Sequence, residues 1–259
     1  MSGLLALTRA ISPRIVECEL THLARAPIDV ARAESQHRAY EAALTALGAT
    51  VQRVAAAPEH PDSVFIEDTA LVFDELAVLT RPGAVSRRGE VVAVEQALAP
   101  HRALARIEAP GTLDGGDVFV AGRRVFAGRT ARSNDAGIAQ LATLLAPHGY
   151  AVVPVEVTGC LHLKSAATAL DDATVLINPA WVRADAFTGL ATVEIAAEEP
   201  GAANIVRVGS TLLMAAEHPR TRTRIESRGY LVHTVPADEL AKAEGAVTCC
   251  SLLFTLHSS

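Results

Sequence analysis

The residues best suited to chemistry lie near the C-terminal end of the chain, where Cys249 and Cys250 stand side by side. They follow a segment of small residues and enter an apolar run that predicts a strand over 247–254. Adjacent residues in an extended chain point to opposite faces, so one thiol can enter a cavity while the other packs into the core. A cysteine nucleophile also needs a base or a cation that holds it as a thiolate. His162, which lies between two leucines, is the candidate.

Each of these residues has an ordinary alternative. An isolated cysteine is usually a small buried hydrophobe. A lone histidine is usually a core or surface residue whose polar atoms are satisfied by its neighbours. The two residues therefore indicate catalysis only in combination with other polar residues of the chain.

Short polar segments occur near the ends of the predicted strands, at 61–68, 81–88, 111–117 and 129–134. Each of these segments also has an ordinary interpretation. Glu67 and Asp68 could form a solvated strand end, and Asp117 could only fix an Asx turn. Arg87 and Arg88 could be a pair of surface residues. Taken together, the segments place carboxylates, arginines and glycines at the ends of successive units. Such a set suits a ligand that is cationic at one end and carries a carboxylate at the other.

Apolar strand patterns alternate with helical patterns along the whole chain, which predicts an α/β protein. The predicted strands are 69–73, 76–80, 118–121, 125–127, 152–157, 175–178, 205–208, 211–215, 231–235 and 247–254. The predicted helices are 30–47, 89–98, 135–145 and 221–228, the third with Asn134 as its N-cap. Gly122 and Gly209 mark hairpin turns between neighbouring strands. The strand–hairpin–helix unit recurs about every 45 to 60 residues, as in propellers and arrays, and we expect one domain over 1–259.

Composition excludes several classes of protein. The 259 residues are 50% hydrophobic with a net charge of −6, and they contain no basic run or basic patch suited to nucleic acid. The four cysteines have no CxxC spacing, so a zinc ribbon or redox motif is not expected. No apolar run approaches the roughly 20 residues that a membrane span needs, and the N-terminal segment lacks the apolar run of a signal peptide. These features predict a cytoplasmic protein with reduced thiols.

Several of these segments together resemble one family, dimethylarginine dimethylaminohydrolase of the guanidino-modifying (pentein) superfamily. In the order of that family they are FIED at 65–68, TRPGA at 80–84, SRR at 86–88, LDGGD at 113–117, LHLKS at 161–165, AAN at 202–204 and VTCCS at 247–251. The resemblance covers nearly the whole chain. It implies the pentein fold, a five-bladed pseudo-symmetric α/β propeller. It also implies a cytoplasmic hydrolase of linear amidines that needs no cofactor and converts Nω-methylated arginine to citrulline and a methylamine.

The resemblance further implies roles for single residues. Cys249 would be the nucleophile, His162 the proton donor and Asp114 the acid that orients His162. Some bacterial relatives carry Glu at the position of Asp114, whose side chain is one methylene shorter. The implied substrate contacts are Leu20 in an N-terminal lid, Asp62, Glu67, Asp68, Arg87, Arg132 and the backbone of Ala243.

Two alternative functions stay open. The first is a hydrolase or deiminase of unmethylated or hydroxylated arginine, and the second is a catalytically inactive pentein that binds amino acids or a partner. The only partner expected is the small-molecule substrate, and the chain would act as a monomer or homodimer. No resident metal is expected, although a zinc ion bound by Cys249 would inhibit the enzyme.

Overall fold

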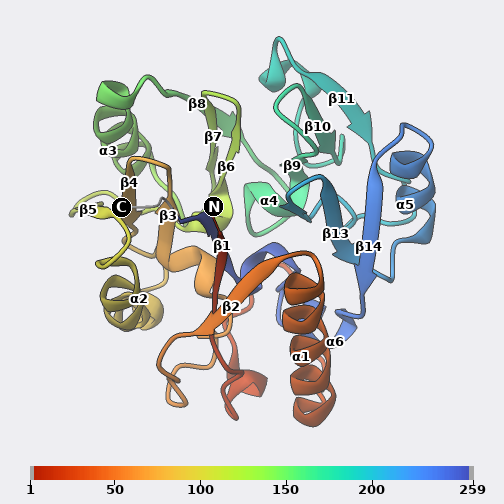
Figure 1. Ribbon diagram of the computed structural model, residues 1–259, viewed down its shortest axis with the longest axis horizontal. Helices are drawn as coiled ribbons and strands as arrows, with labels where there is room; N and C mark the ends of the chain where they lie inside the picture. Colours follow the sequence, from red (N-terminus) through yellow and green to blue (C-terminus); the bar gives the residue numbers. More distant parts are fainter. Residues whose placement is uncertain (1–2, 257–259) are drawn as a thin grey trace.

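Five three-stranded sheets stand around a common axis in the computed structural model, which describes residues 3–256 (Figure 1). The strands are β1 (Leu4–Thr8), β2 (Ala49–Arg53), β3 (Ala70–Val72), β4 (Leu76–Leu79), β5 (Ala103–Arg106), β6 (Val118–Ala121), β7 (Arg124–Arg129), β8 (Ala151–Glu156), β9 (Ala167–Ala169), β10 (Thr174–Ile177), β11 (Ala191–Glu194), β12 (Ile205–Val208), β13 (Thr211–Ala215), β14 (Leu231–Val235) and β15 (Leu252–Thr255). The α-helices are α1 (Val30–Ala46), α2 (Val91–Leu98), α3 (Asp135–Leu145), α4 (Leu163–Ala166), α5 (Pro219–Glu226) and α6 (Asp238–Ala241).

All five sheets have the same internal topology. The middle strand pairs antiparallel with the inner strand and parallel with the outer strand, as β4 does with β3 and β5. An antiparallel pair needs only a tight turn, and the predicted turns at Gly122 and Gly209 are confirmed, both with φ of 60°. A parallel pair needs a longer crossover. Helices α1, α2, α3 and α5 supply it in four blades and lie on the outside of the ring (Figure 1).

The ring closes because the two ends of the chain share one sheet. In the sheet β15-β1-β2 the last strand pairs antiparallel with the first, with Leu5 opposite Phe254. The closing sheet therefore repeats the topology of the other four with strands from opposite ends of the sequence. The predicted fold, a five-bladed pseudo-symmetric α/β propeller, is confirmed.

Apolar faces of the helices and sheets form the core between neighbouring blades. Helix α3 buries Ile138, Leu141 and Leu145 at helical spacing, in one cluster with Val118 and Val125 of the adjacent sheet. The predicted N-cap is confirmed, because the Asn134 side chain accepts a hydrogen bond of 2.8 Å from the backbone N–H of Gly137. This packing holds each blade at a set angle to the next.

One predicted strand is wrong in its first half. Residues Thr248–Cys250 form a 3₁₀ turn, and β15 begins only at Leu252. The cause is tertiary, because the Asn204 side chain accepts from the Thr248 backbone N–H at 3.0 Å and donates to Thr248 Oγ1 at 2.9 Å. The argument from strand alternation at Cys249 and Cys250 therefore fails, although the two thiols still differ in surroundings.

The inner strands β3, β6, β9, β12 and β15 line a channel of about 280 Å³ along the axis. Its walls also include Glu67, Lys164 and Thr248, which precede three of these strands. No helix among residues 3–256 is long and apolar enough to cross a membrane.

Candidate active site

Polar segments from four blades meet at one end of the axis, because each directly precedes an inner strand. They are the 3₁₀ turns Ile66–Thr69, Gly115–Asp117 and Thr248–Cys250, and helix α4. The turn Ile66–Thr69 contacts both other turns, and α4 contacts Gly115–Asp117. The pseudo-symmetry of the fold thus gathers segments that lie up to 180 residues apart in sequence, as the hydrogen bond between Glu67 and Thr248 shows.

A small buried hollow lies where these segments meet. Seven of the predicted site residues line it: Asp62, Asp68, Arg87, Arg132, His162, Ala243 and Cys249. Three others do not. Asp114 lies behind His162, Glu67 faces the axial channel, and Leu20 packs half-buried against the apolar cluster beside the hollow. Phe65 and Leu161 also line the hollow, and the sequence analysis gave them no role.

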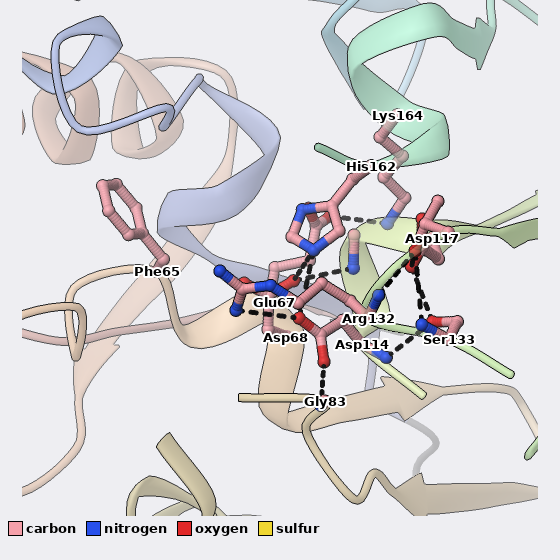
Figure 2. Close-up of polar contacts among 12 residues, drawn as sticks. Phe65, Glu67, Asp68, Gly83, Asp114, Asp117, Arg132, Ser133, His162 and Lys164 are labelled. Atoms are coloured by element: carbon pink, nitrogen blue, oxygen red, sulfur yellow. Dashed lines mark hydrogen bonds and ion pairs between the residues drawn. The ribbon is translucent and has the colours of Figure 1, made fainter. Parts of the chain in front are cut away.

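His162 is held by carboxylates. Its Nε2 donates to Asp114 Oδ2 at 3.1 Å and lies 3.9 Å from Asp68 Oδ1, so the shorter acid at position 114 does reach the ring (Figure 2). Burial lowers the pKa of His162, but Asp68, Asp117 and Asp114 outweigh this effect and raise the pKa to about 9. The imidazole is therefore protonated at neutral pH and suited to give a proton to a leaving group.

The glycines of the DGGD segment let the backbone approach the site closely. A Cβ on Gly116 would lie 2.6 Å from His162 Nδ1 and 2.8 Å from Asp68 Oδ1. The Gly116 backbone N–H donates to Asp68 Oδ1 at 2.9 Å. Glycine is therefore required here by close contact.

Asp68 and Arg87 form a buried ion pair at 2.5 Å. Burial raises the pKa of Asp68, but His162 and Arg87 outweigh it and lower the pKa to about 2. Arg87 also makes two hydrogen bonds to the carboxylate of Glu90, of 3.1 and 2.8 Å. The Arg87 guanidinium thus already has carboxylate partners on both sides, and Asp68 is held as an anion that faces the hollow.

Arg132 is bound less tightly. Its Nη1 lies 3.8 Å from Asp114 Oδ2, and its Nη2 donates to Thr21 Oγ1 over 3.5 Å. Both contacts are long for a charged hydrogen bond. Of the two arginines that line the hollow, Arg132 is therefore the one with donors able to take up a ligand anion.

Cys249 lies in the wall of the hollow, whereas Cys250 lies behind it. The Cys250 thiol donates to the Ala246 carbonyl at 3.5 Å and is 1% exposed. Burial, with the nearby charges of Glu67 and Asp68, raises the pKa of Cys249 to about 12. The nucleophile candidate is thus a neutral thiol at neutral pH.

We expect a direct titration to show this neutral thiol. Thiolate absorbance at 240 nm, taken as the difference between the wild type and Cys249→Ser, should stay flat as the pH rises to about 9, since the pKa of an exposed thiol is about 8.5. The Cys250→Ser variant serves as the control and should give the wild-type curve. A step near pH 7 that only Cys249→Ser lacks would contradict the expectation.

Glu67 is bound from the channel side. Its carboxylate accepts from Lys164 Nζ at 2.6 Å (Figure 2). It also accepts from Thr248 Oγ1 at 2.7 Å. Lys164 follows His162 by two residues in the same motif. This spacing was the one sequence signal that Lys164 lies near the site. The ion pair lies between the axial channel and the turn that carries Cys249.

The predicted lid segment Glu19–Leu23 lies beside the hollow, and Glu19 lines it. The Glu19 backbone N–H donates to Asp62 Oδ2 at 3.1 Å, and the N–H groups of Thr21 and Leu23 donate to the Glu244 carboxylate at 3.0 and 2.6 Å. Glu244 follows Ala243 and has a φ of 56°. Backbone contacts thus connect the lid to the segment that carries the predicted Ala243 contact.

One group of side chains among residues 3–256 has the spacing of a metal site. Ligand atoms of Asp68, Asp114 and His162 lie within 4.8 Å of one another, and Cys249 lines the same hollow. An ion held there would occupy the nitrogen that His162 uses toward Asp114. Such a site fits inhibition better than catalysis.

Five blades around a buried hollow lined by a cysteine, a histidine and carboxylates define a pentein of the guanidino-modifying class. No family model matches the sequence. The chain is 43% identical to the N(G),N(G)-dimethylarginine dimethylaminohydrolase of Streptomyces coelicolor over 95% of each chain. The chain belongs to the dimethylarginine dimethylaminohydrolase family.

Solved structures agree with this assignment. The Pseudomonas aeruginosa DDAH C249S mutant complexed with citrulline superposes with a TM-score of 0.92 at 34% identity, covering 96% of this chain and 98% of that one. The N-terminal domain of ArgZ, an arginine dihydrolase from cyanobacteria, has a TM-score of 0.83 at 20% identity over 96% and 97% of the two chains. The second likeness shows the fold alone.

Proposed function

We propose that this protein hydrolyses monomethylarginine and asymmetric dimethylarginine to citrulline, with release of methylamine or dimethylamine. The observation that carries the proposal is the shared hollow: Cys249, His162 and Asp68 all line it, and His162 is bonded to Asp114. Membership of the dimethylarginine dimethylaminohydrolase family supports the same reaction.

The reaction begins with recognition of the cation. A guanidinium stays protonated in water and is a poor electrophile, because resonance spreads its charge. The anionic Asp68 binds it with charge-assisted hydrogen bonds and holds its plane still. The positive charge of the substrate also lowers the pKa of the Cys249 thiol, which then releases its proton to solvent. The nucleophile thus forms only when substrate is present.

Two chemical steps follow. The Cys249 thiolate adds to the guanidinium carbon, and His162 gives its proton to the departing amine as the C–N bond breaks. The product of this step is a covalent S-alkylthiouronium. Neutral His162 then takes a proton from a water whose oxygen adds to the same carbon. The C–S bond breaks, and citrulline and the thiolate are released.

The amino-acid end of the substrate fixes its distance and orientation. Arg132 binds the α-carboxylate, whereas Arg87 pairs with Asp68 and Glu90 and holds Asp68 in place. Asp62, the backbone of Ala243 and the lid residue Leu20 surround the α-amino end, and Glu67 holds the turn of Cys249 from behind. Asp114 orients the imidazole of His162.

Replacement of Asp68 or Arg132 should show which end of the substrate each residue binds. Loss of one member of a buried charge pair costs about 2 to 5 kcal/mol, so Arg132→Ala should raise KM for methylarginine at least about thirtyfold. It should matter little for methylguanidine, which lacks the amino-acid end, whereas Asp68→Ala should harm both substrates alike. Steady-state kinetics with both substrates measure the difference.

Arg129→Ala is the matched control for Arg132→Ala. Arg129 lies three residues away and pairs with Asp135 and Glu156 at the surface. If Arg132→Ala weakened the truncated substrate as much as methylarginine, Arg132 would shape the site rather than bind the carboxylate.

The proposed activity is tested by citrulline release from monomethylarginine, asymmetric dimethylarginine and unmethylated arginine, measured side by side. The proposal expects the two methylated substrates to have the higher kcat/KM. A preference for unmethylated arginine would make the protein an arginine hydrolase, and no release from any of them would refute the proposal.

The remaining properties are part of the same proposal. The partner is a small-molecule substrate, no cofactor takes part, and the enzyme acts as a monomer or homodimer. The four cysteines are free thiols, which supports a reducing, cytoplasmic location. Zinc bound through Cys249 would remove the nucleophile and inhibit the reaction.

A further inference from the structure

Asp117 is a fully buried carboxylate at the end of the turn Gly115–Asp117, and the proposed reaction gives it no role. It does not line the hollow. Its two oxygens accept three hydrogen bonds, from segments that follow two different strands. Burial raises the pKa of Asp117 to about 6, so the carboxyl is ionised at neutral pH, and its three donors fix its position.

One oxygen holds the backbone beside His162. Asp117 Oδ1 accepts from the Leu163 backbone N–H at 3.0 Å, and Leu163 directly follows His162 in the chain. His162 is extended, with φ of −132°, and the chain turns into α4 at Leu163. The contact therefore sets where the chain turns and, with it, the origin of the His162 side chain.

The other oxygen holds the loop of Arg132. Asp117 Oδ2 accepts from Thr130 Oγ1 at 2.7 Å. It also accepts from Ser133 Oγ at 2.6 Å (Figure 2). Thr130 Oγ1 in turn accepts from the Arg132 backbone N–H at 3.0 Å, and Ser133 Oγ accepts from the Asp114 backbone N–H at 3.0 Å. The backbone of Arg132 is thus tied to Asp117 through a single hydroxyl.

We propose that Asp117 is a positioning residue that fixes the acid–base histidine and the carboxylate-binding arginine relative to one another. The inference rests on the proposed roles of His162 and Arg132. In this proposal one buried side chain sets the distance between the guanidinium end of the substrate, where the reaction occurs, and the carboxylate end, which Arg132 binds.

The hydroxyl groups explain why a carboxylate is needed. Each hydroxyl has one proton to donate and already accepts from at least one backbone N–H, so its proton is directed to Asp117. An asparagine has one acceptor oxygen. If that oxygen meets the Leu163 N–H, the amide NH₂ faces the two hydroxyls, and Thr130 Oγ1, which accepts two N–H groups, cannot accept a third. If the amide turns the other way, its NH₂ faces the Leu163 N–H, and that hydrogen bond is lost instead. Asp117→Asn therefore breaks the contacts to one of the two segments in either orientation, and it removes the negative charge from both.

The Thr130 branch can be tested without changing Asp117. Thr130→Val keeps the shape and removes the hydroxyl, while Thr130→Ser keeps the hydroxyl. We expect Thr130→Val to raise KM for monomethylarginine and Kd for citrulline about tenfold, since a buried N–H loses its acceptor. Its kcat should stay within about twofold of the wild type, since the reacting groups are untouched. Thr130→Ser should restore KM and Kd.

Asp117→Asn should change both parameters. It should raise KM and Kd as Thr130→Val does, and also lower kcat by about tenfold to a hundredfold, because a small misplacement of a catalytic group is costly. Thermal unfolding of each variant shows whether it is folded. If Asp117→Asn does not fold, the comparison of Thr130→Val with Thr130→Ser tests the inference.

The inference is overturned if Thr130→Val does not raise KM, whatever its kcat. It is also overturned if Thr130→Ser is no better than Thr130→Val, because the hydroxyl then does not account for the loss. Arg132→Ala is measured in parallel. If Arg132→Ala leaves KM unchanged, the proposed function loses its carboxylate site; if it raises KM while Thr130→Val does not, the inference about Asp117 fails alone.

Discussion

Cys249→Ser is expected to lower turnover at least about 10⁴-fold, the size of loss seen when a nucleophile that works with a partner is removed. A serine hydroxyl is far less acidic than a thiol, so a bound cation cannot generate the alkoxide in this buried site. Cys250→Ser should retain most of the activity, because that thiol lies behind the hollow and contacts the Ala246 carbonyl.

The covalent intermediate locates the nucleophile. We expect mass spectrometry of acid-quenched enzyme to show the thiouronium adduct on wild type and on Cys250→Ser, and none on Cys249→Ser. Cys250→Ala controls for the cost of placing a hydroxyl in an apolar site. An adduct on Cys249→Ser would assign the chemistry to Cys250 and refute the mechanism.

His162→Gly is expected to slow both formation and breakdown of the thiouronium, each by roughly 10²–10⁴-fold. One imidazole gives a proton to the amine in the first step and takes one from water in the second. The raised pKa of His162, about 9, keeps it protonated at neutral pH and so in the form that the first step needs. Asp114→Asn should cost less, because Asp114 acts only on the imidazole.

Rapid-quench single turnovers measure the two steps separately. Added imidazole is expected to restore part of both rates in His162→Gly, since glycine leaves room for it. If the variant formed and hydrolysed the adduct at wild-type rates, His162 would have no part in the mechanism. A loss in Asp114→Asn as large as that in His162→Gly would mean that Asp114 also contacts substrate.

Local signals in the sequence determined much of the fold. Gly122 and Gly209 specify two-residue turns through their positive φ, and Asn134 caps α3 with its own side chain. The helices α1, α2, α3 and α5 were predicted from periodicity within a residue or two of their ends. The strands β1, β2, β5, β9 and β11 were missed, because most of them lack the apolar alternation of a half-buried strand.

Only the tertiary structure decided which residues share the hollow and which lie behind it. Arg87 and Arg132 look equivalent in the sequence, but Arg87 pairs with Asp68 and Glu90, whereas Arg132 makes only long contacts. Asp117 has the pattern of a turn residue, yet its carboxylate bonds to segments 13 to 46 residues away. Hydrogen bonds of this kind depend on where the blades bring distant segments together, and local propensity carries no signal for them. The residue types therefore indicated the chemistry, while the closed ring of blades assigned each residue its partner.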